Sequence, residues 1–124
     1  MKLILLACLS LVVATTAQQN YEIAKVNKNR TFIVLHKPVT TDKEFIEQLK
    51  LVIRDLDKNK SVDLANKKVA ISFFTDKNFA DYKPETNELY KQWSQSYIAE
   101  YTNANKKLVI YPKDLKKLKH IVLK

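Results

Sequence analysis

The chain of 124 residues contains no glycine, and this absence restricts its backbone more than any other feature of the sequence. Glycine adopts positive φ without steric cost, so a chain without it must make its sharpest turns with other residues. Asparagine and aspartate tolerate that region best, and we expect them to supply the turns at Asn27–Asn29 and Asn103–Asn105. The absence also excludes the glycine-rich loops that let a backbone approach a nucleotide phosphate.

The N-terminus has the three parts of a secretory signal peptide. Lys2 gives a positive start, Leu3–Ala14 is an apolar run of 12 residues, and small residues follow up to Ala17. A membrane-spanning helix needs about 20 apolar residues, so this run is too short to stay as an anchor. We expect residues 1–17 to be removed on export and residues 18–124 to form one small domain.

The only cysteine, Cys8, lies inside this leader. Leu5-Leu6-Ala7-Cys8 resembles the cleavage box of bacterial lipoproteins, but cleavage there would leave half of the apolar run on the mature chain. We therefore expect no lipid anchor at Cys8. Without the leader the domain has no cysteine, so it forms no disulfide and is stabilised by packing alone. That fits the bacterial periplasm or the outside of the cell better than a disulfide-stapled animal scaffold.

Basic residues gather at the C-terminal end of the chain. The formal net charge is +9, and loss of Lys2 with the leader would make it +8. Residues 106–124 hold seven lysines and one aspartate, a net charge of +6, whereas residues 18–105 hold 14 basic and 12 acidic residues. A lysine-rich segment attracts anionic partners through a field that salt screens, and it also serves as a solubilising surface.

Apolar periodicity predicts an α+β domain. One long amphipathic helix is expected from about Asp42 to Lys58, beginning with a capping box at Thr41–Glu44. Its apolar residues recur at helical spacing: Phe45, Ile46, Leu49, Val52, Ile53 and Leu56. Strands are expected at 21–26, 31–36, 69–74, 96–101 and 107–111. These elements predict a single mixed or antiparallel sheet of about four to six short strands, with the long helix and one or two short helices packed on it.

Two segments fit more than one structure. The aromatic residues of 90–101 follow a helical period, but the last five residues of that segment also alternate as in a strand. The Asn-rich break after them favours a hairpin of 96–101 with 107–111. The tail, 112–124, is expected to form a short helix that ends in an extended segment, with an edge strand at His120–Leu123 as the alternative.

Aromatic and lysine side chains are interleaved in the second half of the chain. Six rings occur between Tyr82 and Tyr111 with lysines among them. Such rings stack on bases or sugars while the cations meet anions, but they also complete a small core. Export argues against a nucleic acid as the main partner. The expected binding residues are Trp93, Tyr97, Tyr101, Lys113, Lys116, Lys117 and Lys119.

Catalytic patterns are weak in this sequence. Its two histidines, His36 and His120, have no carboxylates at metal-ligand spacing, so no metal or cofactor is predicted. Asp76 and Asp81 follow an apolar strand, where sites often lie, although aspartate there commonly caps a turn. The sequence favours a non-enzymatic domain that binds an anionic or protein partner in the cell envelope. The alternative is a small hydrolase-like enzyme with its site near His36, Asp76 and Asp81.

A set of segments, mostly in the second half of the chain, forms a recognisable pattern: Val69–Lys77, Tyr82-Lys83, Trp93, Tyr97–Tyr101, Leu108–Pro112 and the Ala17-Gln18 junction. This pattern resembles small exported proteins of unknown function that are common in Bacteroidetes-type bacteria. The resemblance covers the first half of the mature chain only loosely. It implies the 96–111 hairpin and a bacterial envelope setting, and it carries over no catalytic or binding residue.

Overall fold

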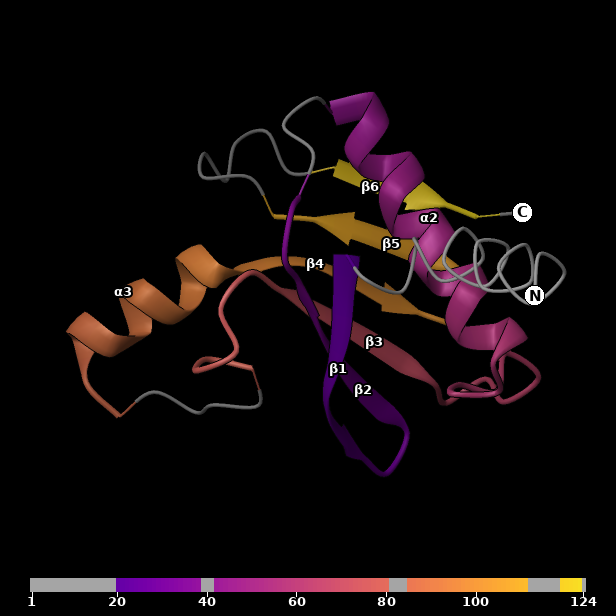
Figure 1. The fold of residues 1–124 in the computed structure, drawn as a ribbon, viewed down its shortest axis with the longest axis horizontal. Coiled ribbons are helices and arrows are strands. Elements are labelled where there is room, and N and C mark those ends of the chain that lie inside the picture. The colour runs from indigo at the N-terminus through magenta and orange to yellow at the C-terminus, as the bar shows by residue number, and fades with distance from the viewer. Residues whose placement is uncertain (1–19, 39–41, 81–84, 112–118, 124) are drawn as a thin grey trace, which may run out of the picture.

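The computed structural model describes residues 20–38, 42–80, 85–111 and 119–123. In these ranges the chain forms six strands, which make one mixed sheet, and two helices (Figure 1). In chain order they are β1 (Tyr21–Asn27), β2 (Arg30–Leu35), α2 (Asp42–Lys58), β3 (Ala70–Phe74), α3 (Asn87–Ser96), β4 (Tyr97–Thr102), β5 (Lys107–Ile110) and β6 (Lys119–Val122). The fold class is α+β, as the periodicity predicted.

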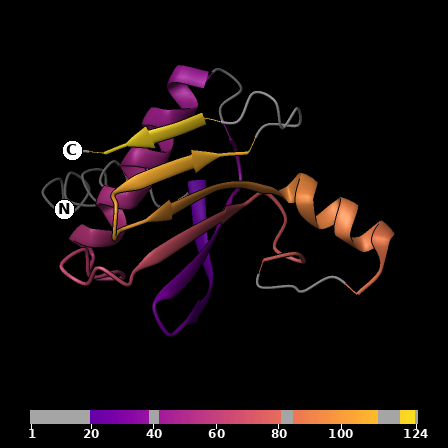
Figure 2. The same ribbon diagram turned by 180° about the vertical axis from the view of Figure 1, so that it is seen from behind.

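The six strands lie side by side in the order in which they occur in the chain (Figures 1 and 2). All neighbouring strands are antiparallel except β2 and β3, which are parallel. A parallel pair cannot be joined by a tight turn and needs a crossover connection, which α2 supplies here. The unit β2–α2–β3 therefore places α2 across one face of the sheet, called the α2 face below (Figure 2).

The main core lies between α2 and this face. The helix residues Leu49 and Leu56 are fully buried, and so are Ile33 of β2, Ile71 of β3 and Leu108 of β5. Full burial of such a side chain stabilises a fold by about 1.5–3 kcal/mol each. The apolar stripe predicted from the helical spacing is therefore what holds α2 on the sheet. The predicted capping box begins at Thr41, which lies outside the described residues.

The segment 90–101 is helical first and extended afterwards. α3 ends at Ser96, where the backbone N–H of Tyr97 still donates to the carbonyl of Trp93, and β4 begins at Tyr97. β4 then pairs with β5, so the predicted hairpin is confirmed. In the tail β6 forms an edge strand that begins at Lys119. The short helix predicted earlier in the tail falls on 112–118, outside the described residues.

Positive φ falls on lysines, so the prediction that asparagine or aspartate would take these positions was wrong. The residues are Lys28 (53°), Lys60 (60°) and Lys106 (53°). Lys28 lies inside the first predicted turn and Lys106 directly follows the second. The neighbouring asparagines act as hydrogen-bond acceptors instead: Asn105 Oδ1 accepts from the Thr102 hydroxyl at 2.6 Å and from a backbone N–H at 3.2 Å. The asparagine therefore braces the turn while the lysine takes the left-handed conformation.

Candidate functional site

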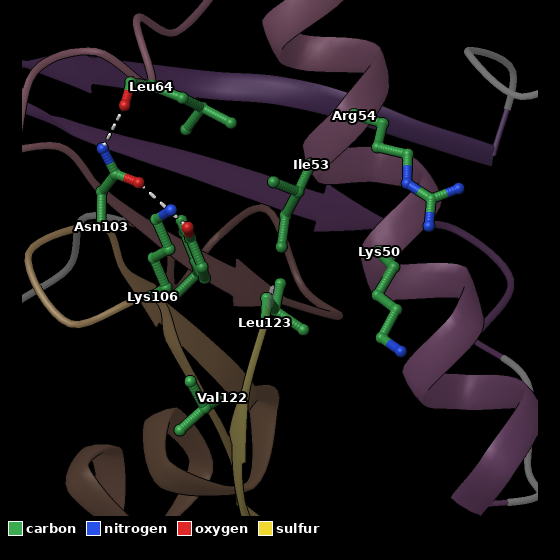
Figure 3. Close-up of a pocket in the computed structure, with 9 residues that line it drawn as sticks. Lys50, Ile53, Arg54, Leu64, Asn103, Lys106, Val122 and Leu123 are labelled. Atoms are coloured by element: carbon green, nitrogen blue, oxygen red, sulfur yellow. Dashed lines mark hydrogen bonds between the residues drawn. The ribbon is translucent and has the colours of Figure 1, made fainter.

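A cavity of about 530 Å³ opens between α2 and the part of the sheet that contains β4 and β6 (Figure 3). We call it the α2–β6 pocket. Its apolar lining comes from four separate parts of the chain: Ile53, Leu64, Tyr101, Val122 and Leu123. Its polar lining is Lys50, Arg54, Asn103 and Lys106. The fold therefore joins the middle of the long helix to the second hairpin and the C-terminal strand.

Among the described residues that line this pocket there are three cations and no carboxylate side chain. Lys50 and Arg54 lie one turn apart on α2, and Lys106 comes from the turn between β4 and β5 (Figure 3). Lys50 Nζ lies 3.3 Å from the exposed carboxylate of Glu47, whereas Arg54 and Lys106 form no ion pair within the described ranges. Like charges around one cavity raise the local concentration of anions.

Asn103 fixes one wall of the pocket. Its side-chain amide donates to the carbonyl of Leu64 at 2.8 Å (Figure 3). The same amide donates to the carbonyl of Asn66 at 2.8 Å, and the backbone N–H of Asn103 donates to the carbonyl of Val69 at 3.0 Å. The hydroxyl of Tyr101 donates to Asn103 Oδ1 at 3.0 Å. Burial raises the pKa of Tyr101, which keeps this hydroxyl protonated as a donor. The pocket wall is thus fixed by hydrogen bonds in the folded chain.

A polar network occupies the opposite face of the sheet. Arg30 Nη1 donates to Glu100 Oε1 and to Ser72 Oγ, both at 2.6 Å. The hydroxyl of Tyr97 donates to Ser72 Oγ at 3.1 Å, and that of Tyr111 donates to Glu100 Oε2 at 3.2 Å. The network joins the neighbouring strands β2, β3 and β4 to Tyr111, the residue that follows β5.

The protonation states in this network follow from burial and from Glu100. Burial lowers the pKa of Arg30, but the hydrogen bond and charge of Glu100 outweigh it, so the net shift is upward. Burial raises the pKa of Tyr97 and of Tyr111, and the charge of Glu100 raises both further. The described buried polar side-chain atoms all have a hydrogen-bond partner. This network therefore ties strands together and leaves no unpaired nucleophile.

Aromatic rings connect the network to α3. The ring of Tyr97 lies 4.6 Å from Phe74 and 5.1 Å from Tyr111, and the Trp93 ring lies 5.4 Å from Tyr97, centroid to centroid. Tyr90, one turn earlier on α3, lies 5.5 Å from Trp93 and is 57% exposed. These contacts are edge-to-face or tilted, which is the favourable arrangement for aromatic pairs.

The predicted binding residues are divided between the two faces of the sheet. Trp93 and Tyr97 touch each other on the network side, whereas Tyr101 is 3% exposed in the core of the α2 face and lines the pocket. Lys113, Lys116 and Lys117 lie outside the described residues, and for Lys119 the structure describes the backbone of β6. A joint binding role for these lysines and rings stays a prediction.

The alternative predicted from the sequence was a hydrolase-like site near His36, Asp76 and Asp81. In the structure, His36 and Asp76 contact different groups and not each other. His36 Nε2 lies 3.9 Å from the carboxylate of Glu22, which also lies 3.5 Å from Lys77 Nζ. Asp76 Oδ1 accepts the backbone N–H of Asn78 at 2.9 Å and so caps a turn. Asp81 lies outside the described residues. No group of three or more potential metal ligands occurs in the part of the chain that the structure describes.

Sequence reasoning missed the cations of the pocket and the ion pair of the network. Lys50 and Arg54 stand at i, i+4 spacing beside the apolar stripe of α2, a signal that the sequence does contain. Lys106 joins them only through the sheet topology. Arg30 and Glu100 are 70 positions apart, so no local pattern connects them.

No protein-family model, curated protein or solved structure matches this chain. Neither of the described helices is long and apolar enough to cross a membrane.

Proposed function

We propose that this protein is an exported, non-enzymatic binding domain whose α2–β6 pocket holds an amphipathic anion. The ligand would be a carboxylate or phosphate group attached to an apolar body. The observation that supports this is the combination of three cations with an apolar floor in one cavity, with no carboxylate side chain among its described lining residues. A ligand of this chemistry places its charged group at the rim and its apolar part against Ile53 and Leu123.

The two halves of the pocket contribute differently to binding. Burial of apolar ligand surface against the floor stabilises the complex by about 25 cal/mol per Å², less the cost of immobilising the ligand. Each exposed cation at the rim adds about 0.2–1 kcal/mol, because water and salt screen its charge. The floor therefore supplies most of the affinity, and the rim selects an anion over a cation.

The compartment is part of the proposal. Residues 1–17 have the composition of a signal peptide, and the second half of the chain resembles small exported bacterial proteins. We propose cleavage before Gln18 and a site of action in the periplasm or outside the cell. N-terminal sequencing of the exported protein should find Gln18 first, and a chain that still begins at Met1 after export would contradict this part of the proposal.

Decanoate, a single-chain carboxylate, is a suitable first probe of the pocket. Calorimetric titration should detect its binding, and decyltrimethylammonium, a cation of equal chain length, should bind more weakly. Replacing both Lys50 and Arg54 by glutamine removes two rim charges, so decanoate affinity should fall about 5-fold. The matched control is Lys91→Gln on α3, outside the pocket, which should leave the affinity unchanged.

Three outcomes would contradict the proposed ligand class. They are no binding of decanoate, equal binding of the cationic probe, and equal effects of the Lys50/Arg54 double variant and the Lys91 control. Far-UV circular dichroism of each variant checks that the α2 helix is retained, so that a change in affinity reports on the rim charges.

A further inference from the structure

The sheet has two outer strands, β1 and β6, and their edges differ. The ladder between β1 and β2 is interrupted between Ile23 and Lys25, where the register shifts. Such a bulge twists an edge and disfavours the pairing of another strand. The ladder between β5 and β6 runs without a shift over its four residue pairs. β6 therefore carries the regular edge, and within the described ranges no strand pairs with its outer side.

The hydrogen bonds between β5 and β6 determine which backbone groups face outward. The N–H of Leu123 donates to the carbonyl of Lys106 at 2.7 Å, so Leu123 points its backbone groups towards β5. In an antiparallel pair these directions alternate along the strand. The backbone N–H and C=O of Ile121 consequently also face β5, whereas those of His120 and Val122 face away from the sheet. Both residues are exposed, Val122 by 64%.

Charge decides what can pair with this edge. The segment 106–124 carries a net charge of +6, and the cations of the α2–β6 pocket stand beside Val122. A second copy of the chain would bring the same positive charge to the edge, and lysines on edge strands oppose that kind of association. An extended segment with carboxylate side chains has the complementary charge.

We propose that the outer edge of β6 accepts an extended acidic peptide as a seventh strand. The peptide backbone pairs with the outward N–H and C=O groups of His120 and Val122 and supplies the main-chain part of the affinity. Its carboxylates on the α2 side lie next to Lys50 and Arg54, which makes the interaction selective for acidic sequences. The peptide shares Lys50 and Arg54 with the small ligand proposed for the pocket, but its backbone pairing with β6 does not require that ligand.

The probe is a fluorescein-labelled hexapeptide of alternating glutamate and valine with blocked ends, and its affinity is measured by anisotropy. The decisive pair of variants is Val122→Pro and Val122→Ala. Proline removes the outward N–H but leaves the β5 ladder intact, because that N–H does not face β5, whereas alanine changes the side chain alone. Binding should weaken roughly 10-fold in Val122→Pro and stay within about 2-fold in Val122→Ala.

Amide exchange of the unmodified protein gives a second measurement that needs no variant. Peptide binding should slow exchange at the N–H groups of His120 and Val122, which otherwise face solvent, and this arm decides the question if Val122→Pro does not fold. An alternating lysine and valine peptide should not bind.

The proposal is overturned by equal affinity for the basic peptide, by equal loss of binding in the two Val122 variants, or by unchanged exchange at His120 and Val122. Sedimentation equilibrium measures whether two copies of the chain form a dimer. A dimer that Val122→Pro dissociates would assign the edge to self-association and would also overturn the proposal. Decanoate titration of the unmodified protein, measured independently, distinguishes a failure of the pocket from a failure of this proposal.

Discussion

At the scale of single residues, the three lysines with positive φ are the least favourable backbone positions in the described chain. A left-handed conformation costs an ordinary L-residue about 1–2 kcal/mol, because Cβ approaches the following carbonyl oxygen. Lys60 is an example of such a position, because it has φ of 60° and its side chain is exposed. It lies in the turn that follows α2, where its backbone N–H donates to the carbonyl of Asp57 at 3.1 Å. The cost at Lys60 is therefore a backbone cost that a substitution can remove.

Replacing Lys60 by glycine should stabilise the fold. The steric cost that is removed exceeds the extra conformational entropy that glycine gives the unfolded chain, so we expect the free energy of unfolding to rise by about 0.5–1 kcal/mol. Urea denaturation measures this change. The matched control is Lys91→Gly in the interior of α3, where the same substitution should lower the free energy of unfolding by about 1 kcal/mol. Destabilisation by Lys60→Gly would contradict the assignment of strain to that turn.

At the scale of elements, local patterns predicted those parts of the fold that depend on neighbouring residues. The apolar spacing that predicted the long helix and the Asn-rich break that predicted the β4–β5 hairpin both act over a few residues. The boundary at Ser96 was less clear, because the aromatic residues of 90–101 follow a helical period while the last five also alternate as in a strand. In the structure the residues from Tyr97 onward contact β3, which lies far from them in the sequence. Local sequence carries no information about such a contact.

The candidate site was less predictable than the elements for the same reason. The parallel pairing of β2 with β3 fixes where α2 lies, and with it where Lys50 and Arg54 stand. Lys106 reaches the pocket only because β4, β5 and β6 follow in strand order. The charge pattern along the chain identifies the lysine-rich C-terminal segment, but it does not determine which lysines line the same cavity.

The attachment of α3 gives a prediction at this scale. α3 contacts the sheet through Trp93, whose ring lies 6.5 Å from Phe74 and 5.4 Å from Tyr97. Figure 1 shows the helix extending away from the sheet at the N-terminal start of β4. Trp93→Ala should therefore speed amide exchange within α3 at least 10-fold and leave β3 protected, because local opening of α3 no longer breaks the ring contacts. Hydrogen exchange with residue resolution measures both elements.

The control for this prediction is Tyr90→Ala, which removes a largely exposed ring from the same helix. It should change exchange in α3 far less than Trp93→Ala does. If both variants increased the rate of amide exchange in α3 equally, the helix would be stabilised by its own helical propensity and not by the Trp93 contacts. If Trp93→Ala also exposed β3, the aromatic side of the sheet would belong to the global unfolding unit.

At the scale of the whole molecule, tyrosines connect both faces of the sheet to the rest of the fold. On the α2 face the hydroxyl of Tyr21 donates to Asp55, which ties β1 to the long helix, and Tyr101 holds Asn103. On the other face Tyr97 and Tyr111 complete the polar network. Burial raises the pKa of all four hydroxyls, and nearby carboxylates raise the pKa of Tyr21, Tyr97 and Tyr111 further.

Alkaline pH should therefore destabilise the protein. In the unfolded chain these tyrosines ionise near the ordinary pKa of about 10, whereas in the fold they stay protonated to higher pH. Above that pH the folded state binds more protons than the unfolded state, so the free energy of unfolding falls as pH rises. The stabilisation is fully present below pH 10 and is lost between that pH and the raised pKa values of the folded state. Urea denaturation at pH steps from 8 to about 11.5 measures the loss.

Tyr97→Phe separates this effect from the simultaneous titration of the lysines. The variant loses one hydrogen bond to Ser72, so it should be less stable by about 1 kcal/mol at pH 8. Phenylalanine has no hydroxyl proton to lose. The free energy of unfolding of the variant should therefore fall less steeply between about pH 10 and 11.5 than that of the unmodified protein. Tyr90→Phe is the matched control at an exposed ring, and its curve should run parallel to that of the unmodified protein. A Tyr97→Phe curve with the same alkaline slope as the unmodified protein would mean that lysine deprotonation, and not the tyrosine network, sets the alkaline limit of the fold.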